Sequence, residues 1–465
     1  MIFCFVLVYT ALFAGCRSES PVPGTAADRT GSGSSIKSEL PVMGKNLKYD
    51  PNIPVNGGKD IVIEFWTASN ADLCKKYANE YSKIHTNVKI EVTEKPWGDY
   101  WKKLLVALRC GQGPDVMWMH NAFTSSIIRY LEPYPEEILP LELLRKDFRQ
   151  VDQHIINGKL YYIDMGIMTG ALIYNKKMWA EAGLTERDMP KTWDQLRKVC
   201  KKLTKVNYKG EIVIAGFNYN TVFRMLAITM AVQKGIFLFK KDGKTAAINN
   251  KEMIEIIKYI KDMYEVDRIG NIIMPTAHEA FGQGRAAIIY DWTWVPGYIK
   301  QTFPDTAENM GLFPVPTFDG KIPPAFDRNN GESSLVVNSG SKDDSKKVAM
   351  DFVKYTLAND DFLIEFDINN GVFPSKLSLD NNPRITGNST LITLSLMIDR
   401  TIWPGPIPEI YEQDVDKYLE QDFLTKNIQA EEAVRRTQEM LDKDLPSTGF
   451  VSVERTYKYA DEFIN

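Results

Sequence analysis

The chain from Ile61 to Met119 reads IVIEFWTASNADLCKKYANEYSKIHTNVKIEVTEKPWGDYWKKLLVALRCGQGPDVMWM. Three runs in it, IVIEFW, VKIEVTE and PDVMWM, are rich in β-branched and aromatic residues, which favour strands. Between them lie two stretches with a helical spacing of apolar residues, near Asp72–His85 and Tyr100–Gly111. Strand, helix, strand, helix and strand in this order predict a parallel sheet with helices packed on it, and therefore an α/β fold.

The residues that follow these three strands are the first candidates for a binding site. Ligands of parallel sheets bind outside the carboxyl ends of the strands, where the following loops lie close together. The residues in these positions are Thr67, Ser69 and Asn70 after the first strand, Trp97 and Asp99 after the second, and His120 and Asn121 after the third. The four that we expect to contact a ligand are Asn70, Trp97, His120 and Asn121.

The first sixteen residues, MIFCFVLVYTALFAGC, are almost entirely apolar. The run is too short to span a bilayer core of roughly 30 Å and has the length of a secretory signal. Its end, Phe13-Ala14-Gly15-Cys16, resembles a bacterial lipobox, which predicts a signal peptide at 1–16 and lipidation of Cys16. Leu12 stands one position early for that motif, and the lack of a preceding basic residue leaves open a start upstream of Met1. The alternative is a buried N-terminal helix.

Residues 17–59 are rich in Ser, Gly and Pro and show no apolar period. Such a composition cannot bury a core, so we expect a flexible tether. A tether after a lipidated cysteine would hold a folded body at the outer face of the cytoplasmic membrane. One acyl chain binds a membrane weakly, and a diacylated cysteine would give a stable anchor.

Composition narrows the class of partner. The chain has 56 Lys and Arg residues against 60 Asp and Glu residues, a net charge of −4, and no basic block, which argues against nucleic acid. With 465 residues it is long enough for two domains. No CxxC pair and no Cys/His metal spacing occurs, so we expect no metal and no cofactor. We interpret Cys74, Cys110 and Cys200 as small buried hydrophobic residues without disulfides.

Further elements follow along the chain. An extended run near 161–168 leads into the strand ALIYNK, and Thr192 is a suitable N-cap for a helix that begins near Trp193. The sequence also favours helices over 222–232, 251–266 and 431–441, and a strand at SLVVN.

Residues 281–297, FGQGRAAIIYDWTWVPG, place Asp291, Trp292 and Trp294 directly after the apolar run 286–290. The two rings are either core residues or a platform at a cleft. In an extended segment they would share a face, whereas at the start of a helix they would diverge. Asp291 is either a ligand acceptor or a cap for the next turn.

Several segments, in order from Ile61 to Leu445, resemble the extracellular solute-binding proteins, family 1, of ABC importers. Within that family the chain resembles the maltose-binding-protein-like sugar-binding lipoproteins. The matching segments are IEFW, GQGPDV, ALIYNK, PKTWDQL, GQGRAA, FPVP, VAMDFVKYTLAND and GVFPS. The resemblance implies a periplasmic-binding-protein-like fold, in which two α/β lobes joined by a hinge hold a ligand in the cleft between them. It implies lobe 1 at 60–166 plus 275–335, lobe 2 at 167–274 plus 336–465, and a crossing at Asp164–Thr169.

The resemblance also implies site residues. Trp292 falls where the maltose-binding protein stacks a tryptophan on sugar, and Trp403 and Phe223 fall near other cleft aromatics of relatives. Met168 stands where that protein has an acidic residue near the hinge, so a substrate other than maltose is expected. Aromatic rings match the apolar faces of a sugar, and carboxylates and amides match its hydroxyls. The other expected ligand-binding residues are Asp164, Asp291, Trp294 and Glu332.

These observations predict a monomeric extracellular lipoprotein that captures a sugar or oligosaccharide between two lobes and delivers it to an ABC permease in the membrane. One alternative is the same fold with another cargo: a polyamine, a peptide, a phosphorylated compound or a metal chelate. A second alternative is a secreted glycan-active enzyme, which would need paired carboxylates. The motifs GxSxG, HExxH and GxxxxGK[ST] are absent, which argues against the enzyme classes that use them. A lipoprotein that senses or scaffolds without transport is a third alternative.

Overall fold

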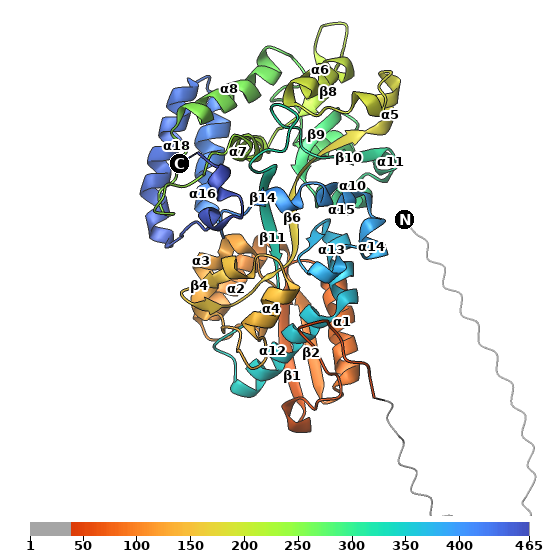
Figure 1. Cartoon of the computed structure of the whole chain (residues 1–465), viewed down its shortest axis with the longest axis vertical. Coiled ribbons are helices and arrows are strands. Elements are labelled where there is room, and N and C mark those ends of the chain that lie inside the picture. The colour runs from red at the N-terminus through yellow and green to blue at the C-terminus, as the bar shows by residue number, and fades with distance from the viewer. Residues whose placement is uncertain (1–38, 465) are drawn as a thin grey trace, which may run out of the picture. The chain divides into compact units, whose positions relative to one another are not determined.

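The structure is a computed structural model that describes residues 39–464 (Figure 1). The expected signal at 1–16, with Cys16, and the first part of the expected tether lie outside the described residues. The later part of that tether is folded, which corrects the expected bounds of 17–59. Leu47 is 0% and Tyr49 2% exposed in a hydrophobic core, and the Tyr49 hydroxyl donates to Asp351 at 3.0 Å. These two side chains, with the bonds from Asn46 and Leu47 to the Asp147 carboxylate, hold this Gly- and Pro-containing segment on the body.

The first sheet has the strand order β12-β3-β1-β2. Its strands are β1 (Ile61–Thr67), β2 (Val88–Glu94), β3 (Val116–Met117) and β12 (Val336–Val337). β1 is parallel to β2 and β3, and β12 is antiparallel to β3. The helices α1 (Ala71–Ile84) and α2 (Trp97–Arg109) connect the parallel strands. This arrangement confirms the α/β prediction for this part of the chain.

The second sheet has the order β14-β11-β6-β9-β8-β7, and β10 and β13 also pair with β6. Its strands are β6 (Asp164–Asn175), β7 (Lys205–Val206), β8 (Ile212–Asn218), β9 (Ala286–Trp292), β10 (Met310–Phe313), β11 (Asp327–Ser333), β13 (Phe373–Pro374) and β14 (Thr401–Ile402). A small separate hairpin joins β4 (Ile155–Ile156) and β5 (Lys159–Leu160).

The remaining helices divide between two hydrophobic cores. The first core takes side chains from α3 (Thr124–Ile127), α4 (Leu141–Asp147), α12 (Asp343–Ala358), α13 (Asp360–Asn370), α14 (Pro383–Thr386) and α15 (Ser389–Ser395). The second takes them from α5 (Lys176–Glu181), α6 (Trp193–Leu203), α7 (Phe223–Gln233), α8 (Lys251–Glu265), α9 (Ala277–Gly282), α10 (Val295–Thr302), α11 (Pro304–Ala307), α16 (Glu409–Asp414), α17 (Asp422–Thr425) and α18 (Ala430–Asp444). A π-helical segment, Val415–Gln421, joins α16 to α17. In residues 39–464 none of the helices is both long and apolar enough to cross a bilayer.

The chain crosses between the two cores at three places. β6 is 12 residues long, and it contributes Met168 to the first core and Leu172 to the second. β11 runs antiparallel to β6 and carries the chain back, and the two strands lie side by side between the lobes (Figure 1). The third crossing follows α15, where Ile398 belongs to the first core and Ile402 to the second. The expected crossing at Asp164–Thr169 therefore lies in β6.

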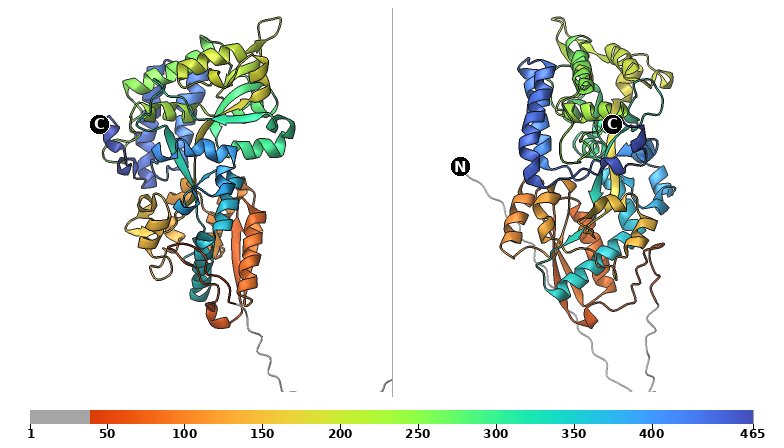
Figure 2. Two further views of the ribbon diagram at one scale, coloured as in Figure 1. Left: turned by 45° about the vertical axis from the view of Figure 1, so that its right-hand side comes forward. Right: turned by 60° about the vertical axis from the view of Figure 1, so that its left-hand side comes forward.

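The later parts of the lobes differ from the expected bounds. Residues 275–325 belong to the second core, because β9 pairs with β8 and with the far half of β6. Residues 335–398 belong to the first core, because α12 and α13 return to the first sheet. Figure 2 shows this return, with the cyan helix α12 beside the orange elements of the first sheet in both views. The expected assignment of 275–335 to lobe 1 is corrected accordingly, and that of 336–465 to lobe 2 holds only from about residue 402 onward.

The predicted start of α6 is confirmed. The Thr192 side chain accepts from the backbone N–H of Gln195, and the Gln195 side chain accepts from the backbone N–H of Thr192, which forms a capping box. Trp193 is 1% exposed, and its indole N–H donates to Gln233 at 2.8 Å.

Two of the three cysteines expected to be buried are buried. Cys74 and Cys200 lie in the cores, whereas Cys110 is exposed, which corrects the expectation for that residue. Cys110 follows the last residue of α2 and precedes Gly111 in a turn at the surface, so its side chain has no core to enter. All three thiols are free.

Candidate functional site

A cavity of about 790 Å³ lies between the two lobes. Loops after β1, β2 and β3 form one wall, the crossing strands form the floor, and α7, the β9–α10 turn and the segment after β14 form the other wall. The lining residues include Ser69, Asn70, Trp97, Trp118, His120, Asn121, Met168, Arg224, Trp292, Trp294, Tyr298, Gln301, Arg328, Asn329, Asn330, Glu332, Asn370, Trp403 and Glu412. The cavity therefore takes side chains from both lobes and from the strands that join them.

The first wall presents an aromatic ring on a rigid support. Trp97 is 44% exposed at the first turn of α2. Its ring meets Trp118 edge-on at 5.4 Å and His120 at 5.2 Å. Behind it, Trp101 stacks on Phe123 with centroids 3.8 Å apart. Because the supporting rings are packed, Trp97 can offer a flat apolar surface with little loss of side-chain entropy on binding.

The second wall carries two tryptophans with different surroundings. Trp292, the last residue of β9, packs against both cores, and the Arg328 guanidinium lies 4.4 Å from its ring centroid. Trp294 is the N-cap of α10, is 36% exposed and lies 6.2 Å from the ring of Tyr298. The chain is therefore extended up to Trp292 and turns into a helix at Trp294, and both residues line the cavity.

Trp403 also lines the cavity, although it is only 1% exposed. The His154 ring lies 4.4 Å from it, on the side of the crossing strands. With this exposure the ring offers a ligand little surface in the present arrangement.

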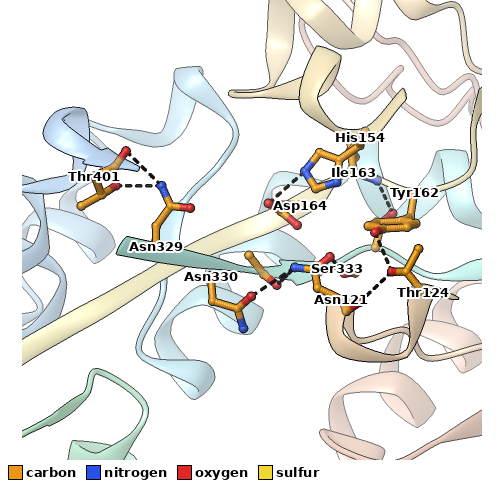
Figure 3. Close-up of polar contacts among 12 residues, drawn as sticks. Asn121, Thr124, His154, Tyr162, Ile163, Asp164, Asn329, Asn330, Ser333 and Thr401 are labelled. Carbon is orange, nitrogen blue, oxygen red and sulfur yellow. Dashed lines mark hydrogen bonds and ion pairs between the residues drawn. The ribbon is translucent and has the colours of Figure 1, made fainter. Parts of the chain in front are cut away.

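Side chains of the first lobe are bonded to β11 at the cavity floor (Figure 3). The Asn121 amide donates to the Gly331 carbonyl at 2.8 Å and to Asn330 at 3.3 Å, and its oxygen accepts from the Ser333 hydroxyl at 3.1 Å. Asn121 is 2% exposed, so most of its hydrogen-bonding capacity is already used. On the other side of β11, Asn329 donates to Thr401 Oγ1 at 2.8 Å. These bonds hold the floor of the cavity in place, and they leave few of its amide groups free to bind a ligand.

Two acidic residues lie close together at the floor, at different depths. Glu332 lines the cavity and is 9% exposed, and burial, with a smaller contribution from the charge of Asp164, raises its pKa to about 7. Asp164 is fully buried, and its carboxylate lies 3.0 Å from His154 Nε2. Of these two residues, Glu332 is the one that lines the cavity.

His120 is a neutral group of the first wall. Its Nδ1 accepts the backbone N–H of Ala122 at 3.2 Å, which leaves the proton on Nε2. Burial lowers the pKa of His120 to about 4. At neutral pH this ring therefore offers one N–H donor and no charge.

Two arginines line the second wall and the floor. Arg224, in α7, forms ion pairs with Glu412 at 2.8 Å and with Asp416 at 2.6 Å. Arg328, in β11, is 7% exposed, and its Nε atom is buried without a hydrogen-bond partner. Sequence reasoning did not single out either arginine, nor Glu412. Arg224 follows the expected Phe223 directly, and on a helix that neighbour points to another side.

The structure brings eight of the eleven expected ligand-binding residues to the cavity: Asn70, Trp97, His120, Asn121, Trp292, Trp294, Glu332 and Trp403. It does not bring Asp164, Phe223 or Asp291 there. Asp164 lies below Glu332, and Phe223 is 0% exposed in the second core. Asp291 is 2% exposed, with His278 at 3.2 Å and the backbone N–H of Trp292 at 2.8 Å. Alternation along β9 turns Asp291 away from the face that presents Trp292.

A second hollow of about 510 Å³ continues from the cavity. The two share Asn70, Gly297 and Asn369 in their walls. The Asn70 amide donates to Asn370 at 2.9 Å at this junction. The hollow space between the lobes therefore extends beyond the first cavity.

No group of three or more His, Cys, Asp or Glu side chains that could hold a metal ion occurs within residues 39–464. The lining itself offers ring faces, amides, hydroxyls, the His120 imidazole, two carboxyl groups and two guanidinium groups.

Comparison with known proteins gives one family and one fold. A family model described as bacterial extracellular solute-binding protein matches residues 67–361. A diacetylchitobiose-binding protein of Streptomyces coelicolor is 25% identical over 329 residues, 69% of this chain and 72% of the relative. An arabinooligosaccharide-binding protein of Bacillus subtilis is 25% identical over 334 residues, 68% of each chain.

Solved structures share the fold over most of the described body. The GacH receptor of Streptomyces glaucescens, solved unliganded and with acarbose, aligns with a TM-score of 0.68 at 20% identity, covering 83% of this chain and 98% of that one. A maltose/maltodextrin-binding domain from Bdellovibrio bacteriovorus bound to maltotriose aligns with a TM-score of 0.66 at 20% identity, covering 83% and 100%. This chain and these two proteins therefore share a fold of two α/β lobes joined by a hinge.

Proposed function

Because the chain belongs to the bacterial extracellular solute-binding protein family, we propose that it binds a sugar or oligosaccharide and delivers it to the permease of an ABC importer. The observation that carries this proposal is the cavity of about 790 Å³ between the lobes, with tryptophan rings on both walls and amides and carboxyls between them. The relatives named for diacetylchitobiose and arabinooligosaccharides support the same class of ligand.

The energetics require more than one ring. A sugar face that covers about 100 Å² of apolar ring contributes about 2.5 kcal/mol before costs, at about 25 cal/mol/Å². Micromolar binding needs about −8.2 kcal/mol after the cost of association. Trp97 and Trp292, aided by Trp294 and by hydrogen bonds from the amides, form a set that can reach that value. A single exposed tryptophan would not.

Closure of the lobes is the proposed mechanism. A ligand that touches Trp97 on one wall and Trp292 on the other interacts with both lobes at once, and it therefore favours the arrangement in which they are close. The crossing strands β6 and β11 are the elements that would take up the movement. The closed form would be the one that the permease recognises.

The location outside the cytoplasm is part of the same proposal. The family supports an extracytoplasmic body, and the lipobox-like sequence before Cys16 supports a lipid anchor on the outer face of the cytoplasmic membrane. We propose that the receptor acts as a monomer on this anchor. Feeding cells an alkyne-labelled fatty acid would label the wild-type chain and not the Cys16→Ser variant; label in both would contradict the anchor.

A panel of neutral and acidic oligosaccharides, scored by thermal shift, tests the ligand class. A ligand at 100 times its Kd adds about 2.7 kcal/mol to the stability of the folded state, which gives a clear rise in Tm. We expect at least one saccharide to raise Tm and Trp97→Ala to remove the rise. Tyr208→Ala is the control, because Tyr208 is 92% exposed and lies outside the cavity.

Two outcomes of that panel would contradict the proposal. A rise in Tm with a polyamine, a peptide or a phosphorylated compound and with no saccharide would assign another cargo to the same fold. Release of shorter products during incubation with a glycan would assign an enzyme. The named relatives are binding proteins, which supports capture without chemistry.

A further inference from the structure

We propose that the saccharide bound in the cavity carries an oxyanion, a carboxylate or a sulfate ester, and that Arg328 is the residue that receives it. This inference rests on the proposed function and deepens it. It names an acidic saccharide where the family assignment alone gives only a solute.

The first support is the position of Arg328. It lies in β11 at the floor of the cavity, is 7% exposed and belongs to the lining. Its Nε atom is buried without a hydrogen-bond partner, and within residues 39–464 its guanidinium forms no ion pair. A buried cation without a direct ion-pair partner is costly, and buried charges in proteins are usually paired.

The second support is that the nearby acids already have other partners. Glu412 and Asp416 are both bonded to Arg224, at 2.8 and 2.6 Å. The Asp327 carboxylate, next to Arg328 in sequence, accepts from Thr229 at 2.7 Å and from the Tyr290 hydroxyl at 2.8 Å. It also accepts the backbone N–H groups of Gly170 and Arg328. None of these acids is free to turn to the Arg328 side chain.

The third support is the contact of the guanidinium with an aromatic ring. Its carbon lies 4.4 Å from the centroid of the Trp292 ring, as in a cation–π pair. The donors of a guanidinium lie in its plane, and a face covered by an aromatic ring leaves them available at the edge. An oxyanion in that plane could accept two parallel N–H bonds, which is the arrangement that arginine favours with carboxylates and similar groups.

The contrast with Arg224 shows why only one of the two arginines is assigned this role. Arg224 and Arg328 both line the cavity, but Arg224 has two carboxylate partners and so carries its own neutralisation. Arg328 has no such ion pair within the described residues, and Glu412 and Asp327 attract it without forming one. A ligand oxyanion at Arg328 would give this guanidinium the direct ion-pair partner that it lacks.

The test compares matched saccharides on the full chain by isothermal titration calorimetry. The probes are oligosaccharides from partial hydrolysis of polygalacturonate and alginate (carboxylates), of chondroitin sulfate (carboxylate and sulfate), of carrageenan (sulfate only), and of galactan, mannan and arabinan (neutral). We expect the tightest binder to be acidic, at least tenfold tighter than its neutral counterpart. The carrageenan arm separates sulfate esters from carboxylates.

Three variants locate the anion. Arg328→Met should remove at least tenfold of the affinity for the acidic saccharide and little of that for a neutral one. Arg328→Lys keeps the positive charge but loses the paired N–H donors of the guanidinium, so it should recover part of that affinity. Arg129→Met is the control, because Arg129 also lies over an aromatic ring, that of Tyr130, but is exposed and outside the cavity. Circular dichroism and Tm establish that each variant is folded.

The outcomes distinguish this inference from the proposed function. If neutral saccharides bind more tightly than every acidic one, the inference is overturned and the receptor function stands. If acidic saccharides bind equally well to the wild type and to a folded Arg328→Met variant, Arg328 is not the anion site and the inference is likewise overturned. If no saccharide of either kind binds, the proposed function itself fails.

Discussion

At Gly331 the floor of the cavity leaves no room for a side chain. A Cβ atom placed there would lie 1.8 Å from Cγ of Asp164, and Asp164 is fully buried. The glycine therefore allows the carboxylate of β6 to cross directly over the backbone of β11. Sequence reasoning expected Asp164 to contact a ligand, and the structure instead makes it a support for the strand that carries Glu332 and Arg328.

We predict that Gly331→Ala destabilises the protein by about 1 to 3 kcal/mol, because Asp164 has to move within a packed region. Urea denaturation followed by tryptophan fluorescence measures this. Gly98→Ala is the matched control, since nothing lies within 4 Å of a Cβ at Gly98. Equal stability of the two variants would contradict the close approach.

Glu332 gives a prediction for pH. Burial, followed by the charge of Asp164, raises its pKa to about 7, above the value of about 4.3 for an unfolded glutamate. Between these values the unfolded chain releases the proton while the folded chain keeps it, so the free energy of unfolding falls as pH rises through this window. At pH values below this window Glu332 adds no pH dependence to the free energy of unfolding, because its carboxyl group is protonated in both states.

Glu332→Gln should remove this dependence. We expect the variant to be more stable than the wild type at about pH 7.5, by on the order of 1 to 3 kcal/mol, and equally stable at about pH 4. Chemical denaturation at both values measures it, with the exposed Glu64→Gln as the control. Part of the fall persists in the variant, because burial also raises the pKa values of Glu420 and Glu454 to about 7. A Glu332→Gln variant that is less stable than the wild type at the higher pH would contradict this account.

At the scale of elements, α2 separates binding from packing within one turn. Trp97 is 44% and Trp101 8% exposed, and only Trp97 lines the cavity. Trp97→Ala should lower the affinity for the saccharide about 10- to 50-fold with little change in Tm, because it removes about 2 kcal/mol of ring burial in the complex. Trp101→Ala should lower the stability by about 3 to 5 kcal/mol, because its stacking on Phe123 is lost. Calorimetry and denaturation distinguish the two; the reverse pattern would contradict the assignment of the wall.

The elements also show which predictions a sequence supports. The strand–helix series from Ile61 and the N-cap at Thr192 depend on residues a few positions apart, and the structure confirms both. The four residues expected to contact a ligand after the first three strands reach the cavity for a similar reason, since the carboxyl ends of parallel strands lie together; they are Asn70, Trp97, His120 and Asn121. The sequence near Arg328 could not predict that this residue lacks an ion pair. That depends on distant residues, because Glu412 and Asp416 pair instead with Arg224 in α7.

At the scale of the whole molecule, the errors concern where segments return. α12 packs beside β1 across more than two hundred residues of sequence, and no periodicity within α12 states which sheet it covers. The same holds for Leu47 and Tyr49, whose burial depends on a surface built by later segments. Periodicity predicts that a helix is amphipathic, whereas the choice of lobe comes from long-range packing.

Two lobes joined by three crossings can move relative to each other, and the central claim is that they close on the ligand. The most direct test is small-angle X-ray scattering of the full chain, first alone and then with the tightest saccharide of the panel at saturating concentration. The account predicts a smaller radius of gyration in the complex, because a ligand held by Trp97 and Trp292 draws the lobes together. An unchanged radius, with binding verified in the same sample by calorimetry, would contradict it.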